Sequence, residues 1–292
     1  MIRFDGPSPG GWQVDSGVVL ENSAFWTVRN LRIRNSRHLG LRLTGTGTHD
    51  TLVSNVETSG NYLSGIGVYE GASNNLLSDV WAHDNFDRDN GGDDADGIQF
   101  GAADGNVVRR AVCYGNSDDG IDLWESRDVL VEDCWCWQNG RGKTGNGNGF
   151  KLGGGERSSG GQTVRWNVAF ANRAAGFDQN GADVPMRVYN NTAVANAAAY
   201  VFYDVPHDLK NNIAFGGSVD VNDAVRDAHN TWSLDITDPG FVSRRPRDEA
   251  FLRLLPTSPC VDAGADVGLE YAGPRPDLGA FEFIPRSPTT TG

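Results

Sequence analysis

The sequence predicts an all-β fold, a right-handed parallel β-helix in which each coil contains three short strands. Short apolar segments recur every 23–33 residues in a constant order, and no 3.6-residue periodicity typical of helices separates them. Glycine accounts for 38 of the 292 residues, about twice its average share, as expected of a chain with many turns. Together these observations indicate a solenoid of stacked coils.

The first repeated element is a glycine followed by an apolar residue, a variable residue and usually a second apolar residue. Side chains alternate along a strand, so we expect the apolar positions to face the core and the variable position to face outward. The element occurs six times, at Gly40–Leu43, Gly65–Val68, Gly97–Phe100, Gly120–Leu123, Gly149–Leu152 and Gly176–Gln179. Equivalent positions of successive coils should lie about 4.8 Å apart, so aligning these elements predicts which side chains are neighbours.

The second repeated element is a short apolar strand that ends in asparagine, and a third short strand precedes it in each repeat. We expect the asparagine amides to stack on one another at one turn of every coil. The asparagines concerned are Asn35, Asn61, Asn85, Asn116, Asn139, Asn172 and Asn196. Cys113 and Cys136 each lie three residues before such an asparagine and should therefore be stacked neighbours. A pair of buried thiols is favoured over a disulfide, although the sequence does not decide between them.

The repeat distinguishes this fold from other repeat proteins and divides the chain. The L-x-x-L-x-L-x-x-N pattern of leucine-rich repeats is absent, and a β-propeller blade would need four antiparallel strands over about 40 residues. The repeat predicts a β-helix domain over residues 1–231 and a C-terminal return segment over 232–283 that packs on the coils. Residues 284–292, rich in Ser, Thr and Pro, are expected to form a disordered tail.

Composition argues against two classes of function. The net charge of −13 makes sequence-independent nucleic-acid binding an unfavourable hypothesis, because phosphate contacts need a basic face. No run of about 18 apolar residues occurs, so no transmembrane helix is predicted. The chain begins Met1-Ile2-Arg3-Phe4 and shows no signal peptide.

Four aspartates come together when the glycine elements are aligned. Asp96 and Asp119 precede the glycines of two adjacent coils. Asp118 lies in the same turn as Asp119, and Asp122 takes the outward position of the strand that follows. Carboxylates this close are not all ionised without a cation, and oxygen ligands select a hard ion, with Ca²⁺ ahead of Mg²⁺ and Mn²⁺. One Asp-Gly pair is usually turn chemistry, but four aspartates in register favour a metal site.

Lys151 takes the outward position of the next coil, about 5 Å along the column from Asp122. A lone outward lysine is usually a solvated surface residue, but a neighbouring cation would lower its pKa and make the amine a usable general base. Other polar residues nearby are candidate substrate ligands. They are Asn146 and Asn148 in the turn before Lys151, Arg141 and Lys143 in the loop before that turn, and Asp178 in the outward position of the following coil.

The segments that carry these residues resemble polysaccharide lyase family 9, the pectate lyases and their relatives. The similar stretches are Ala95–Ile98, Asn116–Asp122 and Gly145–Gly154, within a similarity that covers about residues 30–217. The resemblance implies β-elimination on an acidic, pectin-like polysaccharide. It also implies one Ca²⁺ held by Asp96, Asp118, Asp119 and Asp122, with Lys151 as the Brønsted base. We also expect a secreted monomer, with its leader removed or absent. The chain begins later than family members usually do, which affects the first coils more than the site.

Three other functions stay open on the sequence. A polygalacturonase-type hydrolase would use paired carboxylates, but its G-H-G and R-I-K elements are absent and it has no need of Lys151. A non-catalytic carbohydrate-binding β-helix would form no unsaturated product. A C5-epimerase would abstract the same proton and leave the polymer length unchanged. The sequence does not decide which uronate polymer is the substrate, or whether cleavage is endo or exo.

Overall fold

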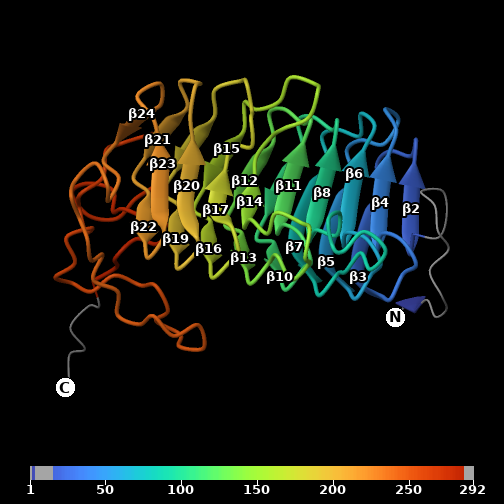
Figure 1. The fold of residues 1–292 in the computed structure, drawn as a ribbon, viewed down its shortest axis with the longest axis horizontal. Coiled ribbons are helices and arrows are strands. Elements are labelled where there is room, and N and C mark those ends of the chain that lie inside the picture. Colours follow the sequence, from blue (N-terminus) through green and yellow to red (C-terminus); the bar gives the residue numbers. More distant parts are fainter. Residues whose placement is uncertain (1, 4–15, 286–292) are drawn as a thin grey trace, which may run out of the picture.

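The computed structural model describes residues 2–3 and 16–285, which form 24 β-strands and no helix. The strands pair in parallel with the strands of the neighbouring coils in both sheets of the molecule. The coils stack along one long axis, with the first strands at one end and the last at the other (Figure 1). The predicted all-β parallel β-helix is therefore confirmed.

One face of the solenoid is a nine-stranded sheet. In spatial order its strands are β2 (Val18–Glu21), β4 (Leu41–Thr44), β6 (Ile66–Tyr69), β8 (Ile98–Gly101), β11 (Ile121–Trp124), β14 (Phe150–Lys151), β17 (Ala175–Asp178), β20 (Ala198–Phe202) and β23 (Ser218–Val221). The six glycine-led elements supply the strands from β4 to β17, and the first five strands begin directly after their glycine. This sheet therefore carries the outward column on which the predicted site depends.

The other faces belong to a fifteen-stranded sheet. Its first coils contribute three eight-residue strands, β3 (Thr27–Arg34), β5 (Leu52–Ser59) and β7 (Leu76–His83), and β1 (Ile2–Arg3) pairs with β3. In later coils two shorter strands replace the long one. The first of these are β9 (Val107–Arg109), β12 (Leu130–Glu132), β15 (Thr163–Arg165), β18 (Arg187–Tyr189), β21 (Asp208–Lys210) and β24 (Arg226–Ala228). The second are β10 (Val112–Tyr114), β13 (Trp135–Trp137), β16 (Val168–Phe170), β19 (Thr192–Val194) and β22 (Ile213–Phe215).

A residue with positive φ marks the bend between the two faces of this sheet. Asn30, Asn55 and Asp79 take φ angles of 59°, 52° and 56° inside the long strands, a region that Asn and Asp tolerate better than most residues. Arg110 occupies the same place in the next coil, where the strand is interrupted. The predicted three strands per coil therefore hold from β9 onward, whereas in the first coils two of them are one bent strand.

Apolar columns fill the interior and fix the register of the coils. Ile98, Phe100, Ile121 and Leu123 are fully buried on neighbouring strands of the nine-stranded sheet. Because side chains alternate, this packing forces the residues between them to the outer wall. A slip of one residue would exchange the core and the wall, so the buried columns determine where the site residues lie.

Asparagine side chains form a ladder of hydrogen bonds inside one turn of the coils. Each Nδ2 donates to the Oδ1 of the next coil at 2.8–3.0 Å, through Asn61, Asn85, Asn116, Asn139, Asn172 and Asn196. The predicted stack is confirmed for these six residues and is wrong for Asn35. Ser36 takes the ladder position, because its N–H donates to Asn61 Oδ1 at 3.0 Å. Asn35 lies exposed at a bend with φ of 55°.

A second ladder was not predicted. It joins Asn167, Asn191, Asn212 and Asn230 at 2.9–3.1 Å between the paired short strands of the later coils. Cys134 precedes Asn167 in this position, and its N–H donates to Asn167 Oδ1 at 2.9 Å. This change of residue type from coil to coil hid the repeat, because only the later coils use asparagine there.

Cys113 and Cys136 are register partners on β10 and β13, as predicted. Both are buried and both are free thiols. Burial raises the pKa of the Cys136 thiol, so this side chain stays protonated and acts as a small apolar group in the core.

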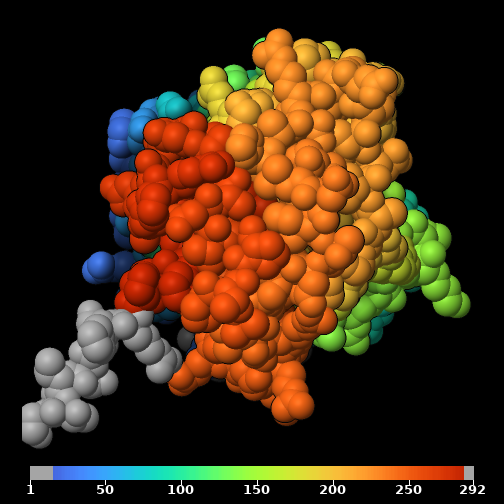
Figure 2. Space-filling view, turned by 90° about the vertical axis from the view of Figure 1, so that its left-hand side faces the viewer, coloured from blue at the N-terminus to red at the C-terminus, as the bar shows by residue number. Residues whose placement is uncertain are grey.

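The C-terminal segment, residues 232–285, packs against the outer wall of the later coils. Its Phe241, Phe251 and Leu278 form a second apolar cluster with Phe170 and Ile213 of β16 and β22. Figure 2 shows this end of the molecule, where orange and red residues form a continuous surface. The division into 1–231, 232–283 and a tail stays a prediction, and residues 286–292 of that tail lie outside the described residues. Within the described ranges, no helix is long and apolar enough to cross a membrane.

Candidate active site

One outward column crosses the nine-stranded sheet as the sequence predicts. Gly67, Gln99, Asp122, Lys151 and Asp178 are register partners on successive strands from β6 to β17. The turns before these strands follow the same register, since each glycine N–H donates to the residue before the next glycine at about 3 Å. The loops before β8 and β11 therefore bring their aspartates to the column.

Asp96, Asp119 and Asp122 converge beside this column. Each offers one carboxylate oxygen within 4.8 Å of the oxygens of the others, and all three side chains are buried. Backbone groups hold two of them in place. The N–H of Asp119 donates to Asp96 Oδ1 at 2.9 Å, and the N–H of Asn148 donates to Asp119 Oδ1 at 2.5 Å. The three acids therefore sit in a fixed arrangement on two adjacent coils.

Asp118 is buried next to this cluster but is held by a different segment. Its Oδ1 accepts hydrogen bonds from the N–H groups of Asn146 and Gly147, at 2.5 and 3.3 Å. Its charge still reaches the cluster, because Asp118 is the strongest charged neighbour acting on the pKa of Asp96. The structure thus brings three of the four predicted ligands together and points the fourth carboxylate at the glycine-rich turn.

Hydrogen bonds do not satisfy all of the carboxylate oxygens in the acidic cluster. Asp119 Oδ2 and Asp122 Oδ1 are buried and have no hydrogen-bond partner among the described residues. Burial raises the pKa of Asp122 to about 7 and of Asp118 to about 8, and it also raises the pKa of Asp96. Buried oxygen ligands without donors suit a hard divalent cation, which would offset the cost of their charge. The cluster can therefore bind a metal ion.

Lys151 lies against this cluster. Its Nζ donates to Asp122 Oδ2 at 3.0 Å and lies 3.5 Å from Asp119 Oδ2. The same nitrogen lies 5.1 Å from the ring centroid of Trp124, which covers it from the end of β11. The side chain is 8% exposed, so the amine is held by the two carboxylates and the indole and is nearly shielded from solvent.

The expected lowering of the Lys151 pKa is not found in this structure. Burial alone would lower it, but the carboxylates of Asp122, Asp119 and Asp96 outweigh burial and raise the pKa instead. The expectation assumed a cation beside the amine, whereas here the carboxylates themselves stabilise the ammonium form. A cation held by the same carboxylates would remove this stabilisation, so the sign of the shift depends on occupancy of the cluster.

The other residues predicted to bind substrate differ in their burial and in their hydrogen bonds. Asn148 is buried, and its Oδ1 accepts from the N–H of Ala175 at 2.9 Å, which gives it a structural bond. Asn146 and Lys143 are exposed on the loop before β14. Arg141 is also exposed and pairs with Asp84 at 2.7 Å. Asp178 follows Lys151 in the column, and its Oδ1 accepts from the N–H of Asn180 at 2.7 Å. The substrate roles of these residues stay predictions.

Sequence alignment of the coils could have found further residues that line the site. Ser64 occupies the position before the glycine, and its Oγ accepts from the N–H of Asp96 at 3.0 Å. Gln99 occupies the outward column, and its Oε1 accepts from the Tyr69 hydroxyl at 2.5 Å. Tyr69 and Trp124 both end strands of this sheet. Their positions follow from the repeat, but their polar contacts depend on side-chain conformations that spacing does not define.

Comparisons with known proteins agree with this architecture. Residues 3–212 match the family described as Pel9A-like, right-handed beta helix region. Pectate lyase L of Dickeya chrysanthemi is 32% identical over 288 residues, which cover 88% of this chain and 67% of that protein. Pectate lyase PEL9 of Emericella nidulans is 28% identical, with coverage of 78% and 64%.

Two solved structures are similar as well. The crystal structure of pectate lyase Pel9A has a TM-score of 0.84 and 26% identity, covering 96% of this chain and 76% of that one. A rhamnogalacturonan lyase has a TM-score of 0.62 at 23% identity, over 82% and 71% of the chains, and shows the shared fold. Fold and relatives together define a polysaccharide lyase. The chain belongs to the Pel9A-like right-handed β-helix family, which confirms the predicted handedness and the resemblance to polysaccharide lyase family 9.

Proposed function

We propose that this polysaccharide lyase cleaves polygalacturonate by calcium-dependent β-elimination, with Lys151 as the base. The observation that carries the proposal is the position of the Lys151 amine, 3.0 and 3.5 Å from two carboxylates of a buried three-aspartate cluster. The pectate lyases to which the chain is similar support the choice of substrate. A rhamnogalacturonan is the second candidate among uronate polymers.

The donor set fits a calcium ion. Asp96, Asp119 and Asp122 would hold it, with Asp118 as the proposed fourth ligand. A bound Ca²⁺ would neutralise the C6 carboxylate of a uronate residue and withdraw charge from C5, which acidifies the C5 proton. The orphaned oxygens of Asp119 and Asp122 are the protein groups that such an ion would satisfy.

Lys151 carries out the proton transfer in this proposal. In its neutral form Nζ accepts the C5 proton, and the electron pair of the C5–H bond forms the C4=C5 double bond. The C4–O bond breaks, its electron pair stays on the glycosidic oxygen, and that oxygen takes a proton from water. The products are a shortened polymer and a 4,5-unsaturated sugar. The indole of Trp124 and the low exposure of Lys151 limit competition from bulk water at Nζ.

The test is incubation with polygalacturonate, a rhamnogalacturonan and a neutral galactan, each with Ca²⁺ or with EDTA. We expect ultraviolet absorbance from unsaturated product on polygalacturonate only when Ca²⁺ is present. New reducing ends without that absorbance would instead identify a hydrolase, and binding without cleavage a carbohydrate-binding β-helix. Inversion of configuration at C5 without shortening of the polymer would identify an epimerase.

The Lys151→Ala variant tests the base directly. We expect an activity loss of about a thousandfold with unchanged circular dichroism, because the amine is the only proposed proton acceptor. Lys210→Ala is the matched control, since Lys210 is paired with Asp208 at 3.1 Å in the fifteen-stranded sheet. Retained activity in Lys151→Ala would rule out its role as base. We infer further that the enzyme acts outside the cell as a monomer, which size-exclusion chromatography and secretion assays would check.

A further inference from the structure

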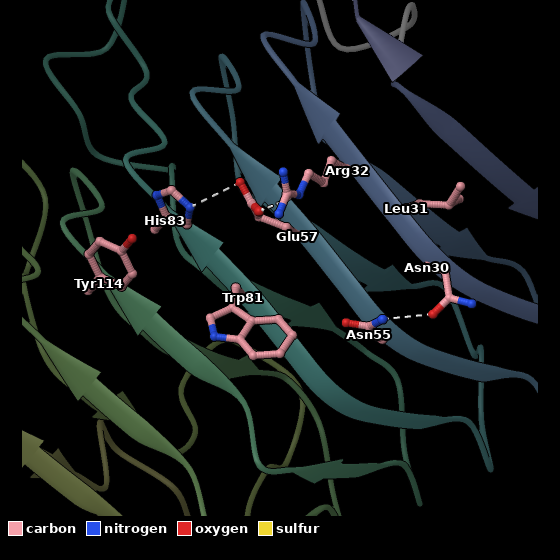
Figure 3. Close-up of a pocket in the computed structure, with 8 residues that line it drawn as sticks. All are labelled: Asn30, Leu31, Arg32, Asn55, Glu57, Trp81, His83 and Tyr114. Carbon is pink, nitrogen blue, oxygen red and sulfur yellow. Dashed lines mark hydrogen bonds and ion pairs between the residues drawn. The ribbon is translucent and has the colours of Figure 1, made fainter. Parts of the chain in front are cut away.

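A second site with polar and aromatic side chains lies on the outer wall of the fifteen-stranded sheet. It is a pocket of about 650 Å³ over the long strands β3, β5 and β7 and the neighbouring β10 (Figure 3). Its lining residues are Asn30, Leu31, Arg32, Asn55, Glu57, Trp81, His83 and Tyr114. None of them belongs to the acidic cluster or to the Lys151 column, so the proposed reaction does not account for this pocket.

Trp81 gives the pocket an apolar surface. Its side chain is 39% exposed, and in Figure 3 its indole lies between Tyr114 and Asn55. Asn55 Nδ2 donates to Asn30 Oδ1 at 2.7 Å, and both residues are exposed on the outer wall. An exposed indole beside hydrogen-bonding amides suits a sugar, which presents apolar C–H faces and hydroxyl groups.

Glu57 organises the charged side of the pocket. Its carboxylate lies 3.1 Å from Arg32 Nε and 3.7 Å from His83 Nε2, and it also pairs with Arg34. Two guanidinium groups on one carboxylate leave a local positive charge even when His83 is neutral. Because the Arg32 side chain is 61% exposed, its terminal nitrogens can bind a carboxylate in the pocket.

This positive charge belongs to a basic first coil in an acidic protein. Residues 22–49 contain five arginines and no Asp or Glu, although the whole chain carries a net charge of −13. Three of these arginines, Arg29, Arg32 and Arg34, lie on β3. A polyanion that approaches the protein is therefore attracted to this coil and repelled by most of the remaining surface.

The pocket occupies the part of the wall that the C-terminal segment leaves uncovered. Further along the same wall, Trp135 packs on Phe251 and Phe281 of that segment, with ring centroids 6.1 and 5.7 Å apart. Trp81 and Trp135 stand in one register column, separated only by Val112. The pocket includes no residue beyond Tyr114, so among the described residues Trp81 is left open while Trp135 is covered.

We propose that this pocket is a second, non-catalytic binding site for an acidic polysaccharide strand, with Trp81 under a sugar ring and Arg32 on a uronate carboxylate. The proposal rests on the proposed function, because it takes the same polymer as ligand. The site lies on a different sheet from Lys151, so it holds a stretch of polymer other than the one being cleaved. Its effect is to keep long chains on the enzyme between cleavage events, and short oligosaccharides gain nothing from it.

The experiment measures binding of polygalacturonate in the Lys151→Ala background, where the polymer is not cleaved. We expect Trp81→Ala to raise the dissociation constant about tenfold and Arg32→Gln to raise it about threefold with a weaker salt dependence. Trp26→Ala is the matched control, since Trp26 is 54% exposed but does not line the pocket. Equal losses in Trp81→Ala and Trp26→Ala, or equal binding of neutral galactan, would overturn the proposal.

Kinetics with Lys151 intact separate this site from the reaction. We expect Trp81→Ala to raise KM on polygalacturonate several-fold and to leave kcat and the activity on trigalacturonate unchanged. An equal loss on trigalacturonate would place Trp81 in the catalytic cleft and overturn the proposal. If the wild-type enzyme cleaves no polygalacturonate, the proposed function fails, whereas the binding comparison still decides whether the pocket takes a uronate chain.

Discussion

Two polar columns pass through the same coils, and they differ in how their hydrogen bonds are satisfied. In the asparagine ladder, Asn139 accepts from the N–H and the Nδ2 of Asn116 at 3.2 and 3.0 Å. It donates to Asn172 Oδ1 and to the Cys113 carbonyl at 3.0 and 3.2 Å. The Asn139 amide uses both of its donors and its acceptor, so this buried side chain stabilises the stacked coils with no polar group left without a partner.

The acidic cluster lies only a few residues away and is the opposite case. Asp119 and Asp122 are just as buried, yet each keeps one oxygen without a hydrogen bond among the described residues. Lys151 offsets part of their charge but not all of it. The comparison teaches that the same solenoid register can build either a satisfied, stabilising column or an unsatisfied one, and that the unsatisfied one is the candidate site.

The largest effect is expected when the acidic cluster loses a charge. Asp122→Asn should lower activity about a thousandfold in the presence of Ca²⁺, because a proposed metal ligand and the partner of Lys151 are lost together. In EDTA, by contrast, the same substitution should stabilise the fold. Burial raises the folded-state pKa of Asp122 to about 7, so its ionised form destabilises the fold above that pH.

The effect of Asp122→Asn on stability should depend on pH in a defined direction. Between the unfolded pKa of 3.8 and the folded pKa of about 7, the folded protein binds the extra proton, so its stability falls as pH rises. In EDTA at pH 8, Asp122→Asn should therefore melt above the wild-type protein, and the difference should vanish near pH 4. Added Ca²⁺ should raise the melting temperature of wild type alone. A variant that melts lower than wild type in EDTA would contradict this account of the cluster.

The repeat explains why so much of the site was predictable. The spacing of the glycine elements placed Asp122 and Lys151 on neighbouring strands, and the register confirms that placement. It did not predict that Asp118 bonds the glycine-rich turn, because that contact depends on the path of the loop before β14. It also missed the ion pair between Lys151 and Asp122, since spacing gives the distance between strands and not the conformation of a long side chain.

The second prediction tests the satisfied column. Asn139→Ala removes four hydrogen bonds and leaves buried partners on both neighbouring coils, so we expect a loss of about 3 kcal/mol in the free energy of unfolding. The matched control is Asn35→Ala, because Asn35 lies exposed one residue before Ser36, which takes the ladder position in its coil. That variant should lose about 1 kcal/mol or less, from its positive φ alone. Urea denaturation measures both, and equal losses would show that the ladder adds nothing beyond the turn.

The smallest expected effect concerns His207, which has one hydrogen-bonded ring nitrogen and one without a partner among the described residues. The side chain is buried, and its Nδ1 accepts from the N–H of Met186 at 3.1 Å. Burial lowers its pKa to about 4 from 6.5, so the unfolded chain binds the extra proton between these values and stability falls as pH drops through them. We expect a cost of about 1 kcal/mol at pH 5, after allowing for solvent screening. His207→Gln should remove that part of the pH dependence in urea unfolding between pH 7 and pH 5. The same pH dependence of stability in both proteins would mean that His207 titrates like an exposed histidine although it is buried. Hydrogen-bond satisfaction alone would then not distinguish the asparagine ladder from the acidic cluster.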